Sequence, residues 1–141
     1  MAQSQSLPVR DVSEEVVSIP ASASLDQAAE TMAAHGVGFL VVTEDGGAVG
    51  ALTDRTLALS LREQVIPEST TVAELATDEL VTIERGMDVL RIVERMKLEE
   101  VRRVVVVDDD EEPTGVVSLD DVLVLLGEEM GDIADLLEAQ V

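Results

Sequence analysis

The feature that most constrains the fold of this chain is an internal duplication. Two amphipathic helices are expected, and the second has its apolar residues at the same four positions as the first, 64 residues later. The matched positions are Leu25, Ala28, Ala29 and Met32 in the first helix and Val89, Ile92, Val93 and Met96 in the second. Gly50 and Gly115, which follow two expected hairpin loops, lie 65 residues apart, as one extra residue in the second loop would give. A period kept through helix and hairpin predicts two copies of one small unit.

Each copy is expected to contain the elements β-α-β-β-α. In the first copy these are strand 16–19 closed by Pro20, a helix from the capping box of Ser24 and Gln27 to Gly36, strands 38–43 and 48–52, and helix 53–64. In the second copy they are a lead-in turn at 72–76, strand 80–83, the second amphipathic helix, strands 103–107 and 116–117, and helix 119–126.

The fold class predicted from these elements is α+β, with two β-α-β-β-α repeats packed in pseudo-two-fold symmetry and a C-terminal helix. One three-stranded unit buries too little surface to be stable alone, so the two repeats are expected to pack face to face. The expected organisation is a disordered leader at 1–7, repeat 1 at 8–66, repeat 2 at 67–127 and an amphipathic helix at 128–141. A short helical turn is expected at 8–14.

The last helix is expected to follow a polar hinge at Gly127. Its apolar stripe consists of Met130, Ile133, Ala134 and Leu137. Such a helix either covers the core of its own chain or contacts a second copy or a partner. Acidic residues on its other face, and Gly127 and Gly131 at its attachment, favour the contact.

The charge of the chain restricts its partners. Thirty acidic residues against nine basic ones give a net charge of −21, which repels nucleic acid and anionic membranes. Acid-rich, lysine-poor surfaces resemble those of proteins from salt-loving organisms, and this favours a halophilic archaeon as the source. An acidic mesophilic protein is the alternative. The absence of cysteine, of a signal-peptide pattern and of a long apolar run predicts a cytoplasmic protein.

The stretch 115–126 contains the strongest candidate site. A short β-branched strand ends at Ser118, which occupies the expected N-cap of a helix, and Asp121 follows three residues later. Backbone N–H groups at a helix start can bind an oxyanion or phosphate, and a carboxylate one turn along can accept hydrogen bonds from two neighbouring hydroxyls. This pairing suits a ribose. Taken alone, the same residues also fit a plain capping box.

Both repeats close with the pattern Gly-apolar-apolar-Ser/Thr-x-x-Asp or a variant of it, at 115–121 and 50–56. With the runs 100–108 and 38–42, this resembles the cystathionine-β-synthase (CBS) domain family, in which a tandem pair is known as a Bateman module. The resemblance covers about residues 8–127. It implies that an adenosyl ligand (AMP, ADP, ATP or S-adenosylmethionine) binds in a cleft between the repeats.

Carried over to this chain, the resemblance places the ribose-binding acid at Asp121 and a phosphate-binding basic residue at Arg103. Residues 18–19 and 38–39 match positions that line the base pocket, although Phe39 fits a core position equally well. The complete main cleft is Ser18, Ile19, Gly38, Phe39, Arg103, Val117, Ser118 and Asp121.

A second cleft is expected to be weaker. Its residues are Thr53, Thr56, Thr82 and Arg102. Thr56 stands where the ribose acid should be, and loss of a charge-assisted hydrogen bond costs about 1.5–3 kcal/mol, or roughly ten- to a hundredfold in affinity.

The function that these features predict is a non-catalytic regulatory module that changes conformation when the adenosyl ligand binds, with a possible effector protein in trans. The alternative is a structural or protein-interaction module with an empty cleft. An enzyme is not expected, since no carboxylate pair stands out among the acids, and no catalytic cofactor is expected. A metal site is not expected either, because loop 108–112 lacks spaced ligands. A homodimer is expected through two apolar helix faces: Val122, Leu123, Leu125 and Leu126 with Leu57, Leu59 and Leu61.

Overall fold

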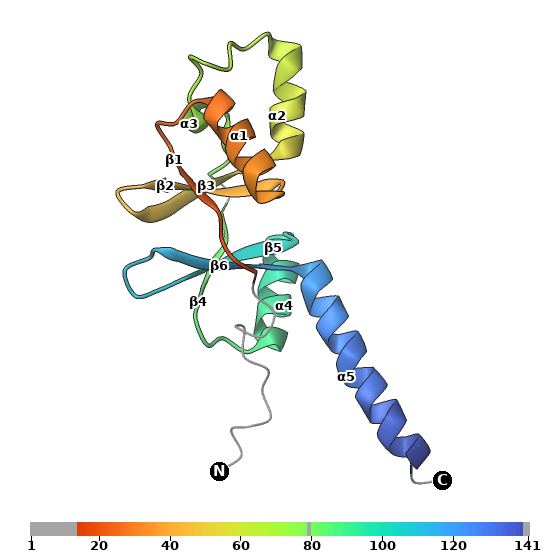
Figure 1. Cartoon of the computed structure of the whole chain (residues 1–141). Coiled ribbons are helices and arrows are strands. Elements are labelled where there is room, and N and C mark those ends of the chain that lie inside the picture. The colour runs from red at the N-terminus through yellow and green to blue at the C-terminus, as the bar shows by residue number, and fades with distance from the viewer. Residues whose placement is uncertain (1–13, 79, 140–141) are drawn as a thin grey trace.

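The computed structural model describes residues 14–78 and 80–139 (Figure 1). The first copy of the unit contains β1 (Ser18–Pro20), α1 (Leu25–His35), β2 (Phe39–Glu44), β3 (Gly47–Thr53), α2 (Asp54–Ser60) and a short 3₁₀ turn, η3 (Leu61–Glu63). The second contains α3 (Val72–Leu75), β4 (Thr82–Glu84), α4 (Val89–Glu99), β5 (Arg103–Val107), β6 (Pro113–Ser118) and α5 (Leu119–Ala139). The α+β duplication is therefore confirmed. The expected leader at 1–7 and most of the expected turn at 8–14 lie outside the described residues.

The two sheets have the same topology. Their strand orders are β1-β2-β3 and β4-β5-β6, with a parallel first pair and an antiparallel hairpin in each. Val42 pairs with Gly50 and Val106 pairs with Gly115, and the register shifts directly after Val42 and directly after Val106. The duplication thus extends to the β-bulge.

The sheets lie between the helices, with α1, α2 and α3 on the outer side of one sheet and α4 on the outer side of the other (Figure 1). Side chains alternate along β5, so Val104 and Val106 pack into the core of repeat 2, whereas Val105 and Val107 pack against the first sheet through Val41. A strand buried on both faces has to be continuously apolar, which explains the valine run of β5.

The lead-in segment of each repeat pairs with the last strand of the other. Glu14 and Val116 exchange two backbone hydrogen bonds of 2.8 and 3.1 Å, and Ala51 and Thr77 exchange two of 3.0 Å. A Cβ placed on Gly50 would lie 2.5 Å from the Thr77 carbonyl oxygen, so glycine is needed at this crossing. The repeats are joined by backbone hydrogen bonds as well as by the apolar layer between the sheets.

Local signals placed both ends of α1 correctly, whereas the helix expected at 53–64 ends at Ser60 and is followed by the 3₁₀ turn η3. Ser24 and Gln27 form the expected capping box of α1, and Gly36 ends that helix in the left-handed conformation (φ 64°). Other expectations were wrong in detail. Glu14 forms a β-bridge instead of a helical turn, Ala29 is exposed on α1, and the lead-in turn at 72–76 contains the helix α3.

The hinge expected at Gly127 is also wrong, because α5 runs without a break from Leu119 to Ala139. Its first turns pack on repeat 2 through Val122, which is fully buried, and through Leu126. Beyond Gly127 every residue up to Ala139 is exposed, and the helix extends away from the body (Figure 1). None of the described helices has the length and apolar character needed to cross a membrane.

Candidate functional site

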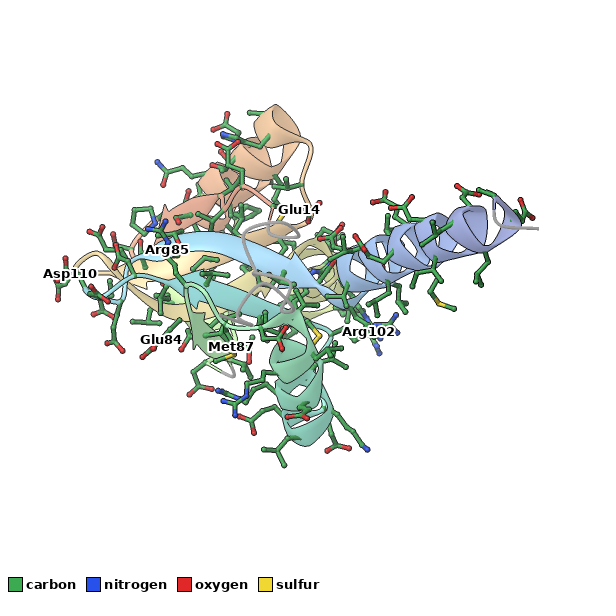
Figure 2. All side chains as sticks on the ribbon, turned by 90° about the horizontal axis from the view of Figure 1, so that it is seen from below. Glu14, Glu84, Arg85, Met87, Arg102 and Asp110 are labelled. Carbon is green, nitrogen blue, oxygen red and sulfur yellow. The ribbon has the colours of Figure 1, made fainter. Side chains whose placement is uncertain are left out.

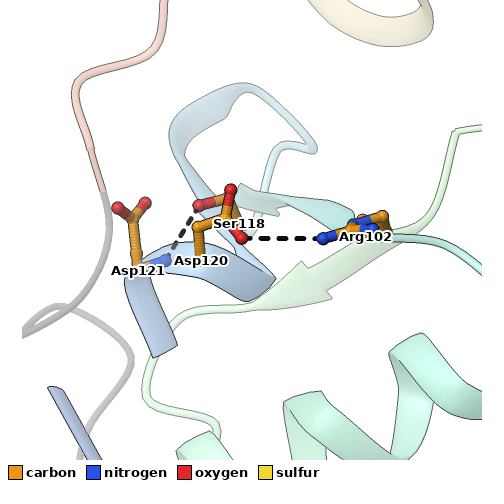
Figure 3. Close-up of polar contacts among 4 residues, drawn as sticks. All are labelled: Arg102, Ser118, Asp120 and Asp121. Atoms are coloured by element: carbon orange, nitrogen blue, oxygen red, sulfur yellow. Dashed lines mark hydrogen bonds and ion pairs between the residues drawn. The ribbon is translucent and has the colours of Figure 1, made fainter. Parts of the chain in front are cut away.

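The candidate site begins where β6 ends and α5 starts. Val117 is fully buried in the core of repeat 2, as is Val122, so the strand end and the first helical turn are both held in place. Between them, the Ser118 hydroxyl oxygen accepts a hydrogen bond of 3.1 Å from the backbone N–H of Asp121 (Figure 3). Ser118 is therefore the N-cap predicted from the sequence.

The side chain of Asp121 is half-buried, and one of its two carboxylate oxygens has no hydrogen-bond donor among the described residues. Its Oδ2 atom is inaccessible to solvent and has no hydrogen-bond partner among the described residues. Leaving a buried acceptor unsatisfied costs about 1–3 kcal/mol, so such atoms are uncommon and call for an explanation. Neighbouring Asp120 does not share this environment, because its carboxylate is exposed and forms an ion pair with Arg102 at 3.6 Å (Figure 3).

Glu14, from the segment that leads into repeat 1, lies beside Asp121. The pKa of Glu14 is raised, mainly because partial burial disfavours its charged form, and further by the negative charge of Asp121. Arg103 acts in the opposite direction and lowers it. A side-chain hydrogen bond to Asp121 also favours the protonated form of Glu14 and raises its pKa further.

Arg103 connects this group to the first repeat. It pairs with Ser118 in the β5–β6 ladder, and its guanidinium carbon lies 5.1 Å from the centre of the Phe39 ring, which is cation–π distance. Phe39 starts β2 and packs against the apolar layer between the sheets. Four residues predicted for the main cleft, Phe39, Arg103, Ser118 and Asp121, are therefore brought together from both repeats.

The other four have different surroundings. Ile19 is only 4% exposed and packs in the core of repeat 1, and Val117 is buried in the core of repeat 2, so neither side chain is available to a ligand. Ser18 is exposed and pairs with Val41 in the β1–β2 ladder. Gly38 precedes Phe39, and the Asp54 carboxylate occupies the space where its Cβ would be. Ile19 and Val117 position their strands and can offer only backbone atoms.

The residues expected for the second cleft are not gathered into one hollow. Thr53 caps α2 through the Thr56 N–H at 3.2 Å, and the two hydroxyls bond to each other at 3.1 Å. Thr56 lines a hollow of about 580 Å³ on the outer side of repeat 1, whereas Thr82 lines another of about 410 Å³ beside Glu84 and Met87. Arg102 is exposed and paired with Asp120.

One carboxylate of the acidic hairpin loop, that of Asp108, supports the structure of the loop itself. Asp108 Oδ1 accepts backbone hydrogen bonds from Asp110 at 2.9 Å and from Glu112 at 3.0 Å. Asp110 itself lies at the tip of the hairpin, far from Arg102, which precedes β5 and lies beside the first turn of α5 (Figure 2). Within residues 14–78 and 80–139, no three histidine or acidic side chains are arranged to hold a metal ion.

Glu14 is the residue of this group that the sequence did not indicate. No motif surrounds it, and Asp121 lies 107 residues later in the sequence (121 − 14). The available signal was the duplication itself, because the bridge from Thr77 to Ala51 in one half is matched by the bridge from Glu14 to Val116 in the other.

Comparison with known proteins agrees with the duplicated architecture. The model of the family described as "CBS domain" matches twice, over residues 9–63 and 65–128. The chain belongs to the CBS domain family. A CBS domain-containing protein of Bacillus subtilis (strain 168), YhcV, is 32% identical over 110 residues, which is 78% of each chain.

Solved structures of CBS proteins have the same fold. The CBS domain pair of protein MJ0100, crystallised with 5′-methylthioadenosine and S-adenosyl-L-methionine, has a TM-score of 0.73 at 23% identity, covering 85% of this chain and 99% of that one. The CBS domain protein PAE2072 of Pyrobaculum aerophilum, in complex with AMP, has a TM-score of 0.70 at 23% identity, covering 82% and 89%. At this level of identity, both comparisons establish the fold alone.

Proposed function

We propose that this CBS pair is a non-catalytic regulatory module that binds an adenosyl ligand between its repeats, at the group formed by Phe39, Arg103, Ser118 and Asp121. The observation that supports this most directly is the buried Oδ2 atom of Asp121, which lacks a donor among the described residues. A ribose hydroxyl is a donor of the right kind. CBS neighbours crystallised with AMP or with S-adenosylmethionine make this ligand class the first to test.

Each side chain of the group has a distinct role in the proposal. Asp121 accepts hydrogen bonds from the ribose hydroxyls, and the Ser118 hydroxyl retains its proton for donation while its oxygen caps α5. The base lies beside Phe39 and Arg103 in this proposal, where the guanidinium already stands over one face of the ring and supplies a positive charge. Apolar, polar and charged groups that converge in this way are typical of small-molecule sites.

Regulation follows from where these residues come from. Phe39 belongs to repeat 1, whereas Ser118 and Asp121 belong to repeat 2, so a ligand that contacts both sets favours one relative placement of the repeats. The output then passes to an effector protein in trans or to a second copy of the chain. We propose a single competent site, because Thr56 replaces the acid in repeat 1 and is already bonded to Thr53.

The proposal includes a cytoplasmic homodimer from a halophilic archaeon. Exposed apolar residues support the dimer, since Leu59 and Leu61 in repeat 1 and Leu123 in α5 are each at least half exposed. Val122 takes no part in it, because it is buried in its own core. The charge of −21 supports a saline environment that screens self-repulsion.

The test is equilibrium binding of AMP, ATP and S-adenosylmethionine, by calorimetry in molar salt, to the wild type, Asp121→Asn and Asp120→Asn. We expect Asp121→Asn to weaken binding about ten- to a hundredfold, since it removes the charge from the acceptor. Asp120→Asn is the matched control, because it removes the same charge one residue away on an exposed side chain. A wild type that binds none of the three compounds would overturn the proposal in favour of a structural or interaction module.

A further inference from the structure

Charged groups from three separate elements meet at the candidate site. They are Glu14 on the lead-in segment, Arg103 on β5 and Asp121 on α5, and the pKa of Glu14 responds to both of the others. When ionised, these side chains carry two negative charges against one positive charge. The nearby Arg102 does not change the balance, because it is paired with Asp120.

Glu14 is fixed at this place by its backbone. Its N–H donates to the Val116 carbonyl at 2.8 Å, and its own carbonyl accepts from the Val116 N–H at 3.1 Å. The segment is therefore attached to the edge of β6 at Val116, two residues before Ser118, and this attachment fixes the backbone from which the Glu14 carboxyl extends. A substitution that changes only its side chain leaves both hydrogen bonds in place.

We propose that Glu14 is a specificity-determining residue, which makes the site select adenosyl ligands with a neutral or cationic group at the 5′ carbon over those with phosphates. This inference rests on the proposed function, and it narrows the ligand class from adenosyl compounds in general to sulfonium and thioether nucleosides.

The reason is electrostatic. A diol donates hydrogen bonds to Asp121 whatever the 5′ substituent is, so the ribose does not discriminate between the ligands. A phosphate adds negative charge beside two carboxylates that one guanidinium cannot neutralise, whereas a sulfonium is attracted to the excess carboxylate.

The experiment measures dissociation constants for S-adenosylmethionine, 5′-methylthioadenosine, AMP and ATP, with a chelator present to exclude magnesium. The proteins compared are the wild type, Glu14→Gln and Glu15→Gln. Glutamine keeps the size of the side chain and the backbone bridge. Glu15 is the next residue and is also exposed, so its substitution changes the net charge equally without removing the charge beside Asp121.

We expect the wild type to bind S-adenosylmethionine and methylthioadenosine more tightly than AMP, and AMP more tightly than ATP. Glu14→Gln is expected to raise the affinity for AMP relative to methylthioadenosine about five- to tenfold, the size of effect of one charge at a partly screened site, while Glu15→Gln leaves that ratio unchanged. An unchanged ratio in Glu14→Gln, with measurable binding, overturns this inference alone. A wild type that binds none of the four overturns the proposed function as well.

Discussion

Replacing Gly50 by alanine tests how the two repeats are joined. The added Cβ would lie 2.5 Å from the Thr77 carbonyl oxygen, whereas real Cβ atoms essentially never come within 3.0 Å of another atom in this way. The lead-in segment of repeat 2, which contains Thr77, must then move away from β3, at the expense of the two 3.0 Å hydrogen bonds between Ala51 and Thr77. Two lost hydrogen bonds at about 1 kcal/mol each, with added strain, give a destabilisation of about 2–4 kcal/mol.

The assay is chemical and thermal unfolding in molar salt, with Gly127→Ala as the matched control. Gly127 lies inside α5, and nothing lies within 4 Å of the position of its Cβ, so the same substitution there should stabilise the helix by about 0.5–1 kcal/mol. The midpoint of Gly50→Ala should fall by about 6–12 °C, while that of Gly127→Ala stays level or rises. If Gly50→Ala unfolded with the same midpoint as the wild type, the close approach of the lead-in segment at Thr77 to β3 would be refuted.

Two further predictions concern Glu14 and α5. Because the folded-state pKa of Glu14 is raised, its contribution to stability is fully present below the unfolded pKa near 4.5 and is lost as pH rises through the folded pKa. The stability of Glu14→Gln relative to the wild type, measured by denaturant titration, should therefore increase between pH 4 and pH 7. A stability difference that does not change with pH would contradict this. If the exposed apolar face of α5 supports the homodimer, Ile133→Glu should shift the mass measured by light scattering toward the monomer, whereas Asp132→Asn should not. Equal masses for both variants would exclude that face.

The parts of the fold that the sequence predicted are those set by local residues or by the period. The capping box at Ser24, the stop at Gly36 and the N-cap at Ser118 each depend on a few neighbouring residues, and each is present in the structure. The hinge at Gly127 failed because one glycine in a helix costs only about 1 kcal/mol, which the surrounding good helix formers can offset.

The surroundings of the site were harder to predict, because they depend on which face of a strand each residue occupies. Ile19 and Ser18 are neighbours, yet Ile19 is buried in a core and Ser18 is exposed, since successive side chains point to opposite faces. The proximity of Glu14 to Asp121 depends on a bridge between the beginning and the end of the duplicated region. Neither propensity nor hydrophobic period carries information about such a contact.

The two halves differ in what their N-caps leave unsatisfied, and this difference bears on how many ligands the pair binds. In repeat 1, the hydroxyls of Thr53 and Thr56 bond to each other, so the cap is complete without a ligand. In repeat 2, Ser118 caps α5 in the same way, but the acid at the matching position has a buried oxygen without a donor. Replacing Thr56 by aspartate would introduce an equivalent acceptor into repeat 1. If an acid at this position is what makes a site competent, calorimetry of Thr56→Asp should show a second equivalent of ligand, and a stoichiometry that stays at one would mean that the geometry around Thr53 also excludes it.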